Sequence, residues 1–187
     1  IGFNAGYAVT TGLYNNLIGA NAGGALTTGT RNVAIGYNAL RTEDEHGKNV
    51  AVGHNTLYTL NAGTDAYNVA IGYDAGVSVS TGVQNTLIGG LAGDALTTGN
   101  YNVAIGYLAL SNEDGHGQNV AVGTFALANQ NAGANALNVA VGYNAGTSMS
   151  TGALNTVIGG FAGDALTTGI ANVAIGYGSL SAEDEHG

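Results

Sequence analysis

The chain has 187 residues, of which 33 are Gly and none is Pro, Cys or Trp. Only 8% of the residues are charged, against about 25% in an ordinary soluble domain, and the net charge is −9. This balance argues against binding to nucleic acid, because phosphate contacts need clustered basic side chains and the chain has only Arg31, Arg41 and Lys48. No apolar run approaches the ~20 residues that span a bilayer, so we expect no membrane insertion within this segment.

A four-residue phrase of the type Val-Ala-Ile-Gly recurs along the whole chain, from a truncated Ile1-Gly2 to the copy at 173–176. Successive full copies are separated by seventeen positions, except for two steps of nineteen that begin at the copies 50–53 and 120–123. An Asn precedes every full copy, and we expect it to stack at a corner of the coil; these residues are Asn15, Asn32, Asn49, Asn68, Asn85, Asn102, Asn119, Asn138, Asn155 and Asn172. Such a short fixed period predicts a solenoid in which each coil contacts only its neighbours.

A second period, which spans four coils and therefore seventy positions, lies over the first. Ala-Leu-Thr-Thr-Gly at 25–29 recurs at 95–99 and 165–169. The cassettes are approximately 1–67, 68–137 and an incomplete 138–187. We therefore predict an all-β parallel solenoid (a β-roll) of about eleven coils, forming a single domain over 1–187. The chain begins within one phrase and ends where the next is due, so we expect a segment cut from a longer fibre.

The phrase itself fits a short strand whose first and third residues share one face. We predict that the Val and Ile of these positions stack into an apolar core. The predicted core residues are Val33, Ile35, Val50, Val52, Val69, Ile71, Ile88, Val103, Ile105, Val120, Val122, Val139, Val141, Ile158, Val173 and Ile175. The Ala between them would then lie on the opposite face, where they would line the contact about a threefold axis in a trimer.

Two further columns follow the strand. The position after the phrase carries an aromatic residue on every second coil, predicting a semi-buried ladder of Tyr37, Tyr73, Tyr107, Tyr143 and Tyr177. Three positions later, pairs of Gly alternate with pairs of Leu, which predicts a surface or core groove with the four-coil period.

Asn-Val-Ala-Ile-Gly followed by Tyr-x-Ala and a Gly-rich turn resembles the head repeat of trimeric autotransporter adhesins, over the whole chain. It is also similar to repeats of phage and bacterial tail-fibre-like proteins. The resemblance implies a left-handed parallel β-roll, three chains to a rod and an extracellular location on a cell surface or virion. The coils of this chain, with their steps of seventeen or nineteen positions, are longer than the adhesin repeat, so the additional residues are expected in protruding loops.

The acidic loops are the sharpest chemical feature of the sequence. Carboxylates beside an imidazole predict either a divalent-metal site, with Ca²⁺ or a transition metal as the ion, or a solvated charged loop. The candidate ligands are Glu43, Asp44, Glu45 and His46, then Glu113, Asp114 and His116, and finally Glu183, Asp184, Glu185 and His186.

The sequence favours a non-catalytic protein, because the nucleophile and metalloprotease motifs are missing and paired carboxylates would repeat in every cassette. We expect a structural and adhesive segment of an extracellular fibre, with self-association as a homotrimer and a surface glycan or protein receptor as partner. A phage tail or head fibre for host recognition is the alternative. A metal-binding or ice-binding solenoid is the alternative of another class, although Thr pairs occupy only two coils in four.

Overall fold

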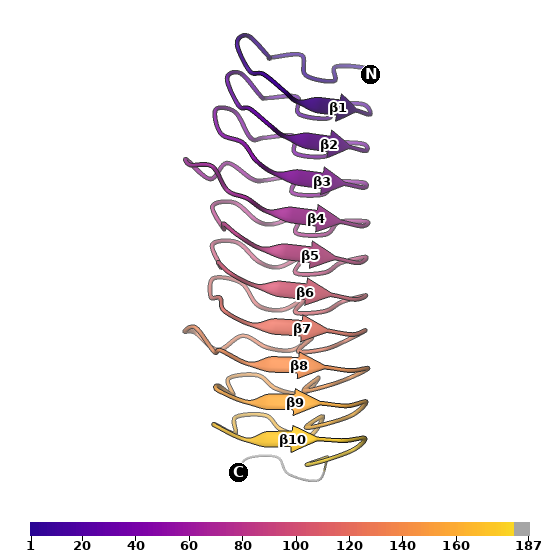
Figure 1. Cartoon of the computed structure of the whole chain (residues 1–187), viewed down its shortest axis with the longest axis vertical. Coiled ribbons are helices and arrows are strands. Elements are labelled where there is room, and N and C mark those ends of the chain that lie inside the picture. Colours follow the sequence, from indigo (N-terminus) through magenta and orange to yellow (C-terminus); the bar gives the residue numbers. More distant parts are fainter. Residues whose placement is uncertain (182–187) are drawn as a thin grey trace.

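The computed structural model describes residues 1–181 and confirms the predicted all-β parallel solenoid. Figure 1 shows the strands stacked above one another along a single long axis, and residues 1–181 contain no helix. The strands are β1 (Asn16–Ile18), β2 (Val33–Ile35), β3 (Val50–Val52), β4 (Val69–Ile71), β5 (Thr86–Ile88), β6 (Val103–Ile105), β7 (Val120–Val122), β8 (Val139–Val141), β9 (Thr156–Ile158) and β10 (Val173–Ile175).

The ten strands form one parallel sheet in sequence order, and equivalent positions of successive phrases pair directly. Val33 pairs with Val50, and Val50 pairs with Val69. Each of the ten full copies of the phrase forms a strand, and the truncated copy Ile1-Gly2 forms none. The two longer coils place their additional residues in loops that project from the stack before β4 and before β8 (Figure 1).

The orientation of the strands is the reverse of the prediction. The middle residue of β2–β10 is buried in the chain's own interior, whether it is Ala, Leu87 or Val157. The first and third residues point outward and keep part of their surface exposed. The predicted core residues that lie outside instead are Val33, Ile35, Val50, Val52, Val69, Ile71, Ile88, Val103, Ile105, Val120, Val122, Val139, Val141, Ile158, Val173 and Ile175. The Ala column therefore cannot line a contact between chains.

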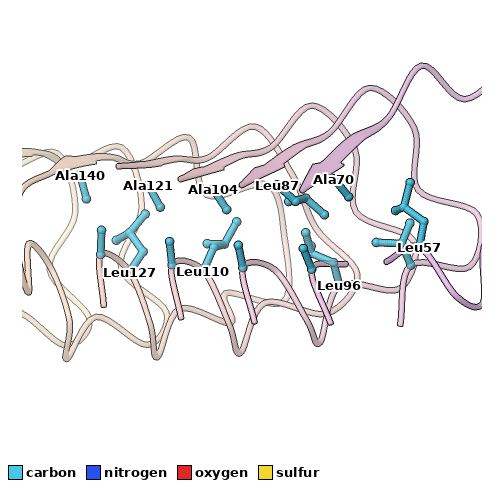
Figure 2. Close-up of a cluster of buried hydrophobic side chains, with 14 of the residues drawn as sticks. Leu57, Ala70, Leu87, Leu96, Ala104, Leu110, Ala121, Leu127 and Ala140 are labelled. Atoms are coloured by element: carbon cyan, nitrogen blue, oxygen red, sulfur yellow. The ribbon is translucent and has the colours of Figure 1, made fainter. Parts of the chain in front are cut away.

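The interior is narrow, and its volume is shared between the strand and the facing wall of the coil. Where the strand contributes Ala, as in β6 and β7, the facing wall contributes a buried Leu110 or Leu127 (Figure 2). Where the strand contributes Leu87, the facing position is Gly93, and a Cβ there would lie 2.8 Å from a methyl carbon of Leu87. Gly76 follows a strand that carries Ala70, and a Cβ there would lie 2.6 Å from a methyl carbon of Leu87 in the next coil. The Gly positions therefore make room for large side chains of their own or of neighbouring coils, and the interior beside them is filled.

Leu residues that face the sheet across the interior adopt an unusual backbone conformation. Leu40, Leu57, Leu110 and Leu127 all have positive φ between 48° and 53°, yet each is fully buried. The left-handed region costs a non-Gly residue roughly 1–2 kcal/mol. Burying a Leu side chain contributes about 1.5–3 kcal/mol, which offsets this cost.

The Gly that ends each strand makes the corner of the coil. These residues have φ between 117° and 141°, a region that side chains rarely adopt. A Cβ built on Gly106 would collide with the carbonyl oxygen of Gly123 in the next coil. The Gly of the phrase is therefore needed both for the turn and for the close stacking of coils.

Candidate functional site

The outer apolar face is defined here as the first and third positions of β1–β10. Seventeen of these twenty positions are Val or Ile, and the others are Asn16, Thr86 and Thr156. Ile71 and Ile158, within the stack, are still 39% and 37% exposed. The face is continuous and carries no charged residue, so it forms an apolar strip along the rod.

The Asn residues at the corner form a continuous ladder. From Asn15 to Asn155, the side-chain Oδ1 of each Asn accepts a hydrogen bond from the backbone N–H of the equivalent Asn in the next coil, at 2.9–3.1 Å. Several of them also donate through Nδ2 to a carbonyl further along the chain, as Asn68 does to Gly82 at 2.8 Å. All nine from Asn32 to Asn172 are buried, so this ladder satisfies backbone groups that water cannot reach.

Aromatic side chains stack on one another at the corner that follows most of the strands. His54 stacks between Tyr37 and Tyr73 with both centroid distances at 5.2 Å. Further along the rod, Phe125 and Phe161 make edge contacts that complete the series Tyr107, Phe125, Tyr143, Phe161 and Tyr177. The predicted tyrosines are about half exposed, apart from the more exposed Tyr177. They therefore lie at the surface, with their rings available to a partner.

The acidic loops contain buried carboxylates. Glu43 and Glu113 have no exposed side-chain surface, whereas Glu45 and Asp114 are exposed. Glu113 Oε1 accepts a hydrogen bond from the His116 backbone N–H at 3.2 Å and lies 3.4 Å from His116 Nδ1. The Glu43 carboxylate has the same bond to His46, also at 3.2 Å. The simple picture of a wholly solvated charged loop is therefore wrong for these two residues.

Neighbouring coils hold the acidic loops in place from both sides. From the preceding coil, the backbone N–H and the hydroxyl of Thr97 both donate to the Asp114 carbonyl. Thr27 does the same to Asp44. From the following coil, Asn135 Oδ1 accepts from the Gly117 N–H at 2.9 Å. The recurring Ala-Leu-Thr-Thr-Gly segment thus serves as the support of the acidic loop.

Burial shifts the ionisation of the two buried carboxylates. Desolvation raises the pKa of Glu113, and the hydrogen bond from the His116 backbone and the nearby His116 ring oppose this rise. Desolvation likewise raises the pKa of Glu43. Asp65 behaves in the opposite way, because the hydrogen bond from Lys48, at an N–O distance of 2.7 Å, lowers the pKa of its carboxyl.

The structure brings some of the predicted metal ligands together. Glu43, Asp44 and His46 have ligand atoms within 4.8 Å of one another, as do Glu113, Asp114 and His116. Glu45 lies outside this group, and Glu183, Asp184, Glu185 and His186 lie outside the described residues. The sequence does not predict the burial of Glu43 and Glu113; the one signal it carries is their place three residues before a His.

Comparison of the chain with protein-family models, curated proteins and solved structures finds no significant match. Over residues 1–181, the structure has no helix with the length and apolar character needed to cross a membrane. The outer apolar face and the acidic loops are therefore the features of this structure that bear on its function.

Proposed function

We propose that the chain is a non-catalytic, structural and adhesive segment of an extracellular fibre, in which three copies associate through their outer apolar faces. The observation that carries the proposal is the continuous strip of Val and Ile on the outside of the sheet. A large apolar patch on a soluble chain marks an interaction site, because leaving it in water is unfavourable.

A copy of the same chain is the partner that fits this strip best. Successive coils lie ~4.8 Å apart along the rod, so the Val and Ile of the strip repeat at that spacing. Another copy presents Val and Ile at the same spacing, so side chains can pack over the full length without mismatch. Three chains is the number supported by the resemblance of the repeat to trimeric adhesin heads. The interface would use the Val and Ile columns, in place of the Ala column expected from the sequence.

The edge of the solenoid from which the chain enters each strand is the natural surface for attachment. It carries the two projecting loops at 61–66 and 131–136 (Figure 1) and the acidic loops. The strands repeat with little change, whereas these loops differ between cassettes: Thr64 and Asp65 correspond to Ala134 and Asn135. A stiff rod with variable loops suits recognition of a surface glycan or protein receptor, whether the fibre belongs to a cell or to a phage.

The oligomeric mass tests the proposal directly. One chain has a mass of 18.4 kDa, and we expect sedimentation velocity or light scattering to give three times that mass. Ile71→Asp with Ile105→Asp places two charges in the outer apolar face, and we expect a monomer that keeps the parent's β-sheet circular dichroism. A parent chain that sediments as a monomer at tens of micromolar would contradict the proposal.

Matched charges placed elsewhere provide the control. Thr64→Asp with Ala134→Asp adds the same two charges at exposed positions of the projecting loops. This variant should remain a trimer. If both double variants dissociate, the added net charge is the cause, and the outer apolar face is not the interface.

A further inference from the structure

The clearest unassigned chemistry lies in the acidic loop of the second cassette. Glu113 Oε1 is 3.4 Å from His116 Nδ1, and Asp114 Oδ1 is 3.9 Å from the same nitrogen. A tetrahedral ion with bonds of about 2.0–2.1 Å holds its ligand atoms roughly 3.3 Å apart. The two separations from His116 are therefore near those that such an ion requires, and all three ligand atoms lie within 4.8 Å of one another.

Two atoms of this cluster are buried and lack a hydrogen-bond partner. They are Glu113 Oε2 and His116 Nδ1, and the Glu113 side chain has no exposed surface. A buried carboxylate oxygen without a partner costs several kcal/mol, so native proteins seldom keep one. An ion beside Glu113 and His116 would supply the missing partner to both residues.

The first cassette provides an internal comparison. Glu43 Oε1 lies 3.8 Å from His46 Nδ1, and that nitrogen is also buried without a hydrogen-bond partner, whereas Glu43 Oε2 accepts from the Ala62 N–H at 3.5 Å. Around this shared cluster the loops differ, since Glu45 corresponds to Gly115 and the Lys48–Asp65 ion pair corresponds to Gln118 and Asn135. The Glu, Asp and His therefore recur at the same spacing although their neighbours change.

We propose that each of these two loops binds one divalent transition-metal ion of the zinc class, through Glu113, Asp114 and His116 in one loop and Glu43, Asp44 and His46 in the other. One imidazole nitrogen with two carboxylates suits Zn²⁺ or Co²⁺, with water completing the coordination. Ca²⁺ is a poor match, because it takes six to eight oxygen ligands. The ions would stiffen the loops that the Thr97 and Thr27 contacts already hold.

Calorimetric titration of the untagged chain with Zn²⁺ tests this site. The working pH is about 7.5, because metal binding needs deprotonated ligands and weakens in acid. We expect at least two ions per chain, a raised melting temperature and, with Co²⁺ as the probe, the visible absorbance of a tetrahedral ion. His46→Gln with His116→Gln should remove two ions per chain and the Co²⁺ absorbance of those sites.

Two further variants keep the test independent of folding. Glu43→Gln with Glu113→Gln retains the shape and burial of both side chains, and should weaken Zn²⁺ binding by at least about tenfold, the loss expected even for a partner outside the first coordination shell. Glu45→Gln removes a nearby exposed charge and should bind Zn²⁺ like the parent. Absence of Zn²⁺ binding, equal binding by the His double variant, or a preference for Ca²⁺ would overturn the proposal. None of these outcomes depends on the oligomeric mass.

Discussion

The two faces of each strand differ in a way that reverses a simple expectation about burial. In β6 the smallest side chain, Ala104, lies inside, while the larger Val103 and Ile105 lie outside. In β5 the inward position holds Leu87, and there the facing wall yields space at Gly93. The comparison shows that interior width, and not hydrophobicity alone, determines which side chain a thin coil can enclose.

The largest effect is expected from a charge on the inward face. Leu87→Asp should unfold the coils around β5, because an unpaired charge would replace a fully buried side chain; a loss above about 4 kcal/mol in the free energy of unfolding is typical of such changes. Ile88→Asp, one residue away on the outer face, should keep the β-sheet signal at room temperature while impairing association. Thermal melts followed by circular dichroism distinguish the two. Equal loss of sheet signal would invalidate the assignment of faces.

A smaller effect is expected at the corner that separates the two faces. Gly106→Ala combines a φ of 137° with a collision against the Gly123 carbonyl, and should cost about 3 kcal/mol or more. Gly63→Ala is the control, since Gly63 also has positive φ but has open space around it; its cost should be about 1 kcal/mol. Chemical denaturation measures both. If both substitutions lower the free energy of unfolding by the same small amount, the coils are not closely stacked at Gly106.

The smallest of the three effects is expected at the other end of the strand. Asn102→Ala removes the acceptor of the Asn119 N–H and the donor to the His116 carbonyl, so we expect a loss of roughly 1–3 kcal/mol. Asn112→Ala removes an exposed hydrogen bond to Asn129 and should change stability by less than about 0.5 kcal/mol. Hydrogen exchange should show faster exchange of the Asn119 amide only in the first variant. Unchanged protection in Asn102→Ala would show that the ladder contributes little.

The aromatic columns illustrate how far the sequence could be read. The position after the phrase Gly carries Tyr37, His54 and Tyr73 in successive coils, so the sequence places His54 between the two tyrosines. That the three rings stack on one another is shown only by the structure. Phe125 and Phe161 come from the neighbouring column, at positive φ, which turns their rings toward the tyrosines. A pattern confined to one column cannot reveal a ladder assembled from two.

The acidic loops show the same limit in another form. Adjacent charges predict exposure, and this holds for Glu45 and Asp114. Glu43 and Glu113 are buried because each folds back onto the backbone of a His three residues later, beneath loops held by the adjacent coils. Their burial depends on contacts between coils and could not be read from the composition of so short a segment.

The sequence by itself determined the coil length, the parallel order and the register, because the repeated Asn and Gly allow only one way for identical coils to stack. It also determined that Val and Ile share one face and Ala the other. Only the tertiary structure decided which face is inside. The reason is steric: a buried Leu of the facing wall leaves room only for Ala on the strand, as Leu110 does opposite Ala104, so the Val and Ile lie outside.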